Sequence, residues 1–163
     1  MMNKTPGGRP ADLLAQHLAL SVPALLLGGA YLAQYGFGLY PCEMCWWQRY
    51  PHFAALALAM LSFVAPLRQF WIALAGLAIF VSGAIGGFHA GVEYGWWEGL
   101  TACSTNVPTT GDALDAIMNA PLIRCDVAPW DLLGISLAGW NFLISCAAGI
   151  GIWELLRRSA RPA

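Results

Sequence analysis

The chain has 163 residues, of which 58% are hydrophobic and only 10% are charged. Soluble globular domains carry about 25% charged residues, so this composition cannot supply the polar shell that a soluble enzyme of this length needs. Eight Lys and Arg residues against nine Asp and Glu residues give a formal net charge of −1. Nucleic-acid binding calls for a basic surface, so no nucleic-acid partner is expected. The composition predicts a small integral membrane protein.

Four stretches of the chain are almost free of charged residues and are long enough to cross a bilayer, which takes about 20 apolar residues. Backbone groups in lipid must be satisfied within each segment. We therefore predict an all-α membrane fold, a bundle of four transmembrane helices in one domain covering residues 1–163. The second stretch is the shortest and reaches full length only by including Arg49 near one end. The predicted spans are 13–33, 46–65, 70–91 and 132–153.

The basic residues predict how this bundle is oriented. With four spans, both termini and the turn between the second and third spans lie on one side of the membrane. The other side holds only two of the basic residues, Arg49 and Arg124. The positive-inside rule therefore puts both termini in the cytoplasm. The segments 34–45 and 92–131 then face outward, which for a bacterial inner membrane is the periplasm. The basic residues on the cytoplasmic side are Lys4, Arg9, Arg68, Arg157, Arg158 and Arg161.

The outer segment 92–131 is long for a loop without structure of its own, and such loops are usually functional. Within it, Leu114, Ile117 and Met118 share one side of a helical pattern. Two interpretations stay open for this segment: a short helix on the membrane surface and an acidic loop without regular structure.

The third predicted span carries Gly83, Gly87 and Gly91 at four-residue spacing. Small residues at this interval let helix backbones approach closely in a bilayer. We therefore interpret these glycines as packing residues.

The chain has five cysteines: Cys42, Cys45, Cys103, Cys125 and Cys146. The orientation derived above puts the first four on the outer side, and the bacterial periplasm is a compartment where disulfides persist. Four cysteines allow three pairings. Cys42 and Cys45 are close enough in sequence to pair with each other, which leaves Cys103 with Cys125. Cys146 falls in the middle of the last span and is interpreted as a small buried hydrophobe without a redox role.

The Cys42-x-x-Cys45 pair lies at the outer mouth of the second predicted span. The N-terminus of a helix and a nearby cation both favour thiolate over thiol. Arg49 follows Cys45 by four residues, one turn deeper on the same helical face. An arginine at that depth is costly in lipid, which makes it a functional candidate. The alternative is a side chain that extends to the headgroups.

Two disulfides on one face of a membrane protein suggest an electron relay. A disulfide in a loop can be attacked by a thiolate of a soluble partner through a mixed disulfide. Electrons then pass by exchange to the Cys42–Cys45 pair, which lies close enough to lipid to meet a lipid-soluble oxidant. The alternative is that both bonds only staple the loops.

At these residues the chain resembles the disulfide bond formation protein B family. Members are bacterial inner-membrane thiol oxidases that keep a periplasmic thioredoxin-fold disulfide donor oxidised and pass the electrons to quinone. The resemblance covers most of the chain, and the combination of its motifs is more specific than any one of them. The motifs are four spans, Pro41-Cys42-x-x-Cys45 followed by Gln48-Arg49, a cysteine pair in the long outer loop, and Cys125-Asp126 before the last span.

The resemblance implies a role for each site residue. Cys103 is expected to form the mixed disulfide with the donor, and Cys125, released as a thiolate, to exchange with Cys42. Cys45 is expected to face the quinone, ubiquinone or menaquinone, and Arg49 to stabilise the complex of the thiolate with the quinone. The implied partners are the periplasmic donor, the quinone pool and the lipid bilayer, and no metal is implied.

Two features depart from the family pattern. The stretch between Cys103 and Cys125 is shorter than in the best-studied members, and the run Phe88-His89-Ala90-Gly91-Val92-Glu93 resembles a subgroup. His89 and Glu93 lie one helical turn apart near the outer end of the third span. Quinone takes up two protons as it forms quinol, so this pair is a candidate for quinone binding and proton transfer. The alternative is a polar pair that marks the membrane interface.

Three other functions are alternatives for a chain with these cysteines. A vitamin K epoxide reductase-like enzyme is also a four-helix thiol–quinone protein, but its active Cys-x-x-Cys belongs to a late helix, whereas here it opens the second. A metal-binding membrane protein would use Cys42, Cys45, Cys103 and His89 as ligands. A structural membrane subunit would use both disulfides only to staple its loops.

Overall fold

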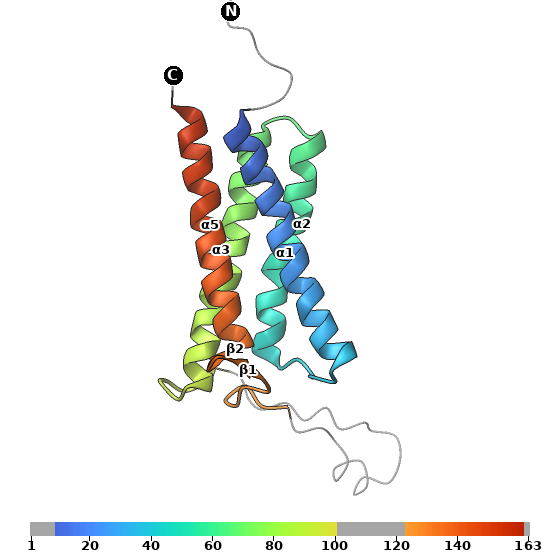
Figure 1. The fold of residues 1–163 in the computed structure, drawn as a ribbon, viewed down its shortest axis with the longest axis vertical. Coiled ribbons are helices and arrows are strands. Elements are labelled where there is room, and N and C mark those ends of the chain that lie inside the picture. Colours follow the sequence, from blue (N-terminus) through green and yellow to red (C-terminus); the bar gives the residue numbers. More distant parts are fainter. Residues whose placement is uncertain (1–8, 101–122, 162–163) are drawn as a thin grey trace, which may run out of the picture.

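The computed structural model describes residues 9–100 and 123–161. Four helices lie side by side along the long axis of the molecule, and the first residues of α1 and the last residues of α5 lie at the same end (Figure 1). The helices are α1 (Pro10–Gly36), α2 (Glu43–Val64), α3 (Arg68–Glu93) and α5 (Leu137–Ala160). The described residues thus confirm the predicted all-helical architecture. Cys103 and the pattern of Leu114, Ile117 and Met118 lie outside them.

Three of the four described helices are long and apolar enough to cross a membrane, judged by length and composition. They are α1, α3 and α5, with mean hydropathies of 1.6, 1.9 and 1.3 over their most apolar windows. Helix α2 is the shortest, with 22 residues, and does not meet this criterion. Its first half carries Gln48, Arg49 and His52, and all three side chains are buried within the bundle. Its low hydropathy therefore comes from residues that face neighbouring helices.

The core of the bundle is built largely from alanine. Small side chains let neighbouring helices approach closely, which raises the van der Waals contact between them. Three isoleucines fill the space that remains between the helices. The fully buried residues of this core are Ala15, Ala19, Ala55, Ala59, Ile72, Ala75, Ile79 and Ile152.

Helix α3 packs against α5 through its glycines, as the spacing predicted. A Cβ atom at Gly83 would lie 2.9 Å from the backbone nitrogen of Cys146, and one at Gly87 would lie 2.8 Å from the Phe142 ring. A Cβ atom at Gly91 would overlap the Trp97 ring. Only glycine fits these positions without movement of the neighbouring helix or ring.

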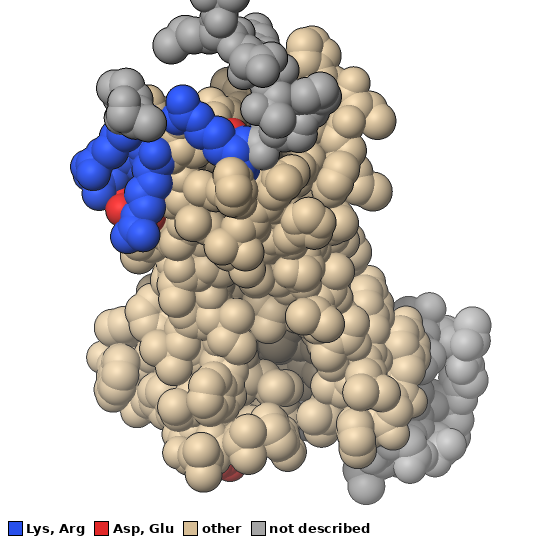
Figure 2. Space-filling view, turned by 45° about the horizontal axis from the view of Figure 1, so that its top comes forward, with Lys and Arg blue, Asp and Glu red and all other residues tan. Residues whose placement is uncertain are grey.

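A polar cluster joins three helices at the end of the bundle where α1 begins and α5 ends. The Asp12 carboxylate accepts hydrogen bonds from Gln69 Nε2 at 3.0 Å and Ser159 Oγ at 2.5 Å, and Arg68 lies 3.4 Å away. Arg9 donates to the Ser159 carbonyl. On the face shown in Figure 2, the Lys and Arg side chains gather at this end.

A short hairpin precedes α5 at the opposite end of the bundle (Figure 1). Strands β1 (Asp131–Leu132) and β2 (Ile135–Ser136) pair antiparallel. The Ser136 backbone N–H donates to Tyr94 Oη at 3.0 Å, which ties the hairpin to the end of α3. Helix α5 therefore begins at Leu137, whereas the last predicted span begins at residue 132.

We expect Gly83→Ala to destabilise the bundle by roughly 1–3 kcal/mol, the usual range for overpacking. The added methyl group would meet the Cys146 backbone, which cannot move without shifting α5. Thermal unfolding of purified protein in detergent measures the effect as a lower Tm.

The matched control is Gly28→Ala in α1, where an added Cβ has no atom within 4 Å. Alanine favours helix over glycine by up to about 1 kcal/mol, so its Tm should stay level or rise. Equal losses of Tm in both variants would mean that α3 and α5 do not pack as described.

Candidate active site

Two cysteines lie together at the first turn of α2. Cys42 is the N-cap of this helix, and its Sγ accepts a hydrogen bond from the Cys45 backbone N–H at 3.2 Å. The two sulfur atoms lie 2.9 Å apart. The Cys-x-x-Cys spacing at a helix start thus places the sulfurs where a disulfide forms or opens with little movement of the chain.

The two sulfurs differ in their surroundings. Cys42 is buried and Cys45 is half-buried. The hydrogen bond with Cys45, together with burial, raises the pKa of the Cys42 thiol to about 12. The same hydrogen bond lowers the pKa of the Cys45 thiol, so Cys45 is the sulfur of the pair that loses its proton more readily.

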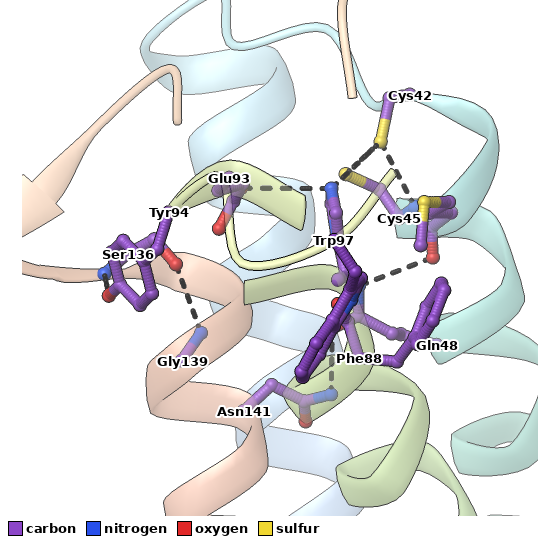
Figure 3. A network of polar contacts seen from close by, with 12 residues as sticks. Cys42, Cys45, Gln48, Phe88, Glu93, Tyr94, Trp97, Ser136, Gly139 and Asn141 are labelled. Atoms are coloured by element: carbon purple, nitrogen blue, oxygen red, sulfur yellow. Dashed lines mark hydrogen bonds and ion pairs between the residues drawn. The ribbon is translucent and has the colours of Figure 1, made fainter. Parts of the chain in front are cut away.

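Helix α3 brings an imidazole and a carboxylate to this pair (Figure 3). His89 Nε2 lies 3.6 Å from Cys42 Sγ and 3.7 Å from Glu93 Oε1. The side chains of His89 and Glu93 are 2% and 3% exposed, so neither is a solvated residue at the rim of the bundle. The predicted pair at one-turn spacing is thus built into the dithiol site.

The segment before the hairpin places a third cysteine beside the pair. Cys125 is buried and packs with Cys42 against Met44 and Val92. Three of the four predicted redox cysteines therefore meet at one place.

The Arg49 guanidinium is held by α1. Its Nη1 donates to Gln34 Oε1 at 2.6 Å, and its Nη2 donates to the Ala30 carbonyl at 3.3 Å. It also lies 5.0 Å from the ring centres of Tyr31 and Trp46, a range in which cation–π attraction operates. These contacts fix the cation on the inner side of α1.

Among the described residues, Arg49 contacts α1 and Trp46 and does not contact the Cys45 sulfur. The two residues instead line the same cavity, of about 260 Å³, between α1, α2 and α5. Leucine and alanine side chains of α1 form one wall of this cavity, and polar side chains of α2 and α3 form another. The polar lining residues are Cys45, Gln48, Arg49, His52, His89, Glu93 and, from α5, Asn141.

A second cavity, of about 250 Å³, adjoins the first, and Cys45 lines both. It is also lined by Cys42 and by Ile123, Arg124 and Val127 of the segment before the hairpin. The dithiol therefore borders two adjoining cavities, one lined by the segment before the hairpin and one lined by apolar residues of α1.

A network of buried polar side chains continues from His89 between α2, α3 and α5 (Figure 3). Gln48 lies 2.8 Å from His89 and 2.9 Å from Asn141, and Asn141 lies 3.0 Å from His52. Neither Asn141 nor His52 is among the site residues predicted from the sequence. The signal was present, since polar residues inside predicted spans are rare and usually functional.

The structure also shows where Cys146 and the candidate metal ligands lie. Cys146 is on α5 opposite Gly83, where the two helices pack closely. The sulfurs of Cys42 and Cys45 and a ring nitrogen of His89 all lie within 4.8 Å of one another, so three of the ligands weighed for a metal site are close together.

Comparison with known proteins identifies the family of the chain. The family model for "Disulfide bond formation protein DsbB" matches residues 13–153. A disulfide bond formation protein B of Verminephrobacter eiseniae is 33% identical over 160 residues, covering 90% of this chain and 86% of the relative. One from Marinobacter nauticus is 29% identical over 154 residues, covering 86% of this chain and 90% of the relative.

No solved structure is a significant match to this chain. The family match nevertheless extends across all four described helices and includes each described cysteine. The chain therefore belongs to the DsbB family of disulfide bond formation proteins, which are membrane-bound disulfide oxidoreductases.

Proposed function

We propose that this protein is a thiol:quinone oxidoreductase of the bacterial inner membrane that reoxidises a periplasmic thioredoxin-fold disulfide donor. The observation that carries the proposal is the position of the Cys42–Cys45 dithiol at two adjoining cavities. One cavity borders the segment that holds Cys125, and the other borders apolar helices with one fixed cation. This arrangement suits a pair that receives electrons from a loop disulfide and passes them to a lipid-soluble acceptor.

The proposal includes four transmembrane helices with both termini in the cytoplasm. The buried polar half of α2 supports a fourth span, because residues that face the bundle do not meet lipid. The basic residues at the end where α1 begins support the orientation by the positive-inside rule. The segments 34–45 and 92–131, with the redox cysteines, then lie in the periplasm.

The proposed electron path uses disulfide exchange at each step. A donor thiolate attacks Cys103, and the Cys103–Cys125 bond breaks with its electron pair left on Cys125. The Cys125 thiolate then attacks Cys42 Sγ, and the electron pair of the Cys42–Cys45 bond leaves on Cys45. The packing of Cys125 against Cys42 supports the second exchange, and the raised pKa of Cys42 supports Cys45 as the charged sulfur.

The inner cavity fits a quinone head group, ubiquinone or menaquinone. Its apolar α1 wall suits the ring, and Arg49 offers a fixed cation to a carbonyl oxygen. A bound quinone supplies an acceptor for two electrons and two protons, which the dithiol gives up as it returns to the disulfide. His89 and Glu93 line this cavity as well, which supports a role for them in delivering protons.

One assay separates this function from the alternatives. Purified protein with a ubiquinone analogue should oxidise a reduced periplasmic donor, with one quinol formed for each donor disulfide. A protein with stapled loops, or one that binds metal, would leave the donor reduced. Membership in the DsbB family favours the relay over a vitamin K epoxide reductase-like enzyme.

Replacing Arg49 with Gln should raise the apparent KM for quinone about tenfold and slow reoxidation of Cys42–Cys45, because the fixed cation is lost; tenfold corresponds to about 1.4 kcal/mol. Steady-state kinetics over a range of quinone concentrations measures this. Exchange between Cys103 and the donor, measured in single turnover without quinone, should be unchanged.

The control for Arg49→Gln is Arg157→Gln, which alters an exposed arginine in the last turn of α5. That variant should keep the parent KM. If Arg49→Gln loses the exchange step and keeps normal quinone dependence, then Arg49 serves folding or topology and the proposed quinone site is misplaced.

Replacing Cys125 with Ser should trap a mixed disulfide between Cys103 and the donor, because the thiol that resolves it is missing. Non-reducing electrophoresis and mass spectrometry of the crosslinked peptide identify the sulfur used. A complex formed through Cys42 or Cys45 would reverse the proposed order. Cys146→Ala serves as the matched control and should leave turnover nearly intact.

A further inference from the structure

The buried amides of Gln48 and Asn141 have only one orientation that satisfies their neighbours. Asn141 Nδ2 lies 3.1 Å from the Ser82 backbone carbonyl, which can only accept a hydrogen bond. The same nitrogen donates to Gln48 Oε1 at 2.9 Å. Gln48 Nε2 in turn lies 3.2 Å from the Met44 carbonyl, so this nitrogen also faces an acceptor. Two backbone carbonyls on different helices thus fix which end of each amide donates.

This orientation determines the state of His89. Gln48 Nε2 lies 2.8 Å from His89 Nδ1, and an amide N–H can only donate. Nδ1 therefore accepts, and in the neutral ring the proton is on Nε2. Nε2 is the nitrogen that lies 3.6 Å from Cys42 Sγ and 3.7 Å from Glu93 Oε1.

The packing of α3 against α5 leaves room for this junction only because residue 86 is glycine. A Cβ atom there would lie 2.9 Å from Asn141 Nδ2 and 3.1 Å from Gln48 Oε1. It would also lie 2.9 Å from the Ala138 carbonyl. The glycine thus lets the two amides meet directly.

We propose that Gln48 and Asn141 are positioning residues that hold His89 in the Nε2–H tautomer, so that its ring donates a hydrogen bond to the Cys42 sulfur. The hydrogen bond becomes charge-assisted, and stronger, whenever Cys42 is a thiolate. In the proposed relay, the second cysteine of the donor displaces Cys103 from the mixed disulfide. The released Cys103 thiolate then attacks Cys125, so that the Cys103–Cys125 bond forms again and the Cys42–Cys125 bond breaks with its electron pair left on Cys42. Only this catalytic consequence rests on the proposed function, since the tautomer exists with or without the relay.

The same tautomer bears on the metal-binding alternative. A histidine ligand offers a nitrogen lone pair to the ion, whereas here an N–H faces the sulfurs. A metal held by Cys42, Cys45 and His89 Nε2 would therefore require both amides to turn over and lose their backbone acceptors.

Nitrogen-15 NMR of histidine-labelled full-length protein in detergent reads the tautomer directly. The chain has three histidines, and the His89 signals are assigned as those lost in His89→Gln. We expect Nε2 to be protonated and Nδ1 unprotonated in the parent protein. In Gln48→Glu, a carboxylate that faces Nδ1 can only accept, so Nδ1 should become protonated. A parent His89 with its proton on Nδ1 overturns the proposal.

A second measurement tests the effect on the sulfur. In a Cys45→Ser background, where Cys42 has no partner thiol in the pair, Gln48→Glu should slow alkylation of Cys42 at neutral pH about tenfold. This corresponds to about one pKa unit, because the N–H that stabilises the thiolate is turned away.

Gln48→Met tests charge separately, since it removes the amide donor without adding a carboxylate. This variant should also slow alkylation of Cys42. A normal alkylation rate in Gln48→Met would mean that the effect of Gln48→Glu comes from its negative charge, and it would overturn the proposal.

Asn141→Leu tests the second amide. It removes the partner of Gln48 Oε1, so the Gln48 amide can rotate and the His89 ring should be a mixture of both tautomers.

The matched control is Ser145→Ala. Ser145 Oγ donates to Asn141 Oδ1 at 2.8 Å, so its removal leaves the bonds of Asn141 Nδ2 in place. Ser145→Ala should keep the parent tautomer and alkylation rate. If it shifts both as Gln48→Glu does, general loosening of the core explains the data and the proposal fails. If the tautomer behaves as expected while the protein does not oxidise a donor with quinone, the proposed function fails and the positioning role stands.

Discussion

The close approach of α3 and α5 is the contact on which the rest of the site depends. Glycines at positions 83 and 86 let the α5 backbone lie directly against α3, and Gly87 leaves room for the Phe142 ring of α5. This contact brings Asn141 of α5 within hydrogen-bond distance of Ser82 on α3 and Gln48 on α2. Polar groups buried among apolar helices must be paired with one another, because neither lipid nor water satisfies them there. The pairing then orients His89, and His89 faces the dithiol.

The start of α2 is fixed by a separate and more local device. The first N–H groups of a helix have no partner within the helix and need a cap. Cys42 supplies this cap through its sulfur, which accepts from the Cys45 N–H. A cysteine that caps its own helix lies beside the cysteine three residues later. The segment from Cys42 to Cys45 therefore both caps α2 and holds the two sulfurs together.

The sequence predicted the parts of the site that depend on spacing along one helix. Cys42 and Cys45 at a helix start, His89 and Glu93 one turn apart, and the glycines of the third span all follow from helical periodicity. The four apolar stretches likewise predicted an all-helical fold. These features need no knowledge of which helices are neighbours.

The remaining features depend on contacts between segments far apart in the chain. Arg49 was expected near Cys45 because of its spacing, but acceptors on α1 hold its guanidinium, and no pattern in the sequence pairs Gln34 with Arg49. The hydrogen bond between Asn141 and Gln48 could not be predicted either, because no pattern in the sequence pairs these two residues. Most of the hairpin before α5 falls within the last predicted span, because its leucines and isoleucine make this stretch of sequence apolar. In the structure, a hydrogen bond from the Ser136 backbone N–H to Tyr94 Oη holds the hairpin at the end of α3.

The two cavities give the dithiol a direction. Cys42 lines the loop-side cavity, Cys45 lines both, and Arg49 lines the inner one. When the Cys125 thiolate forms a bond with Cys42, the electron pair of the Cys42–Cys45 bond leaves on Cys45, so the exchange turns a thiolate at the segment before the hairpin into a thiolate at the inner cavity. No helix has to move for this transfer. In the proposed relay, the two sulfurs are therefore themselves the connection between the periplasmic donor and the membrane acceptor, and the buried polar network beneath them keeps that connection in place.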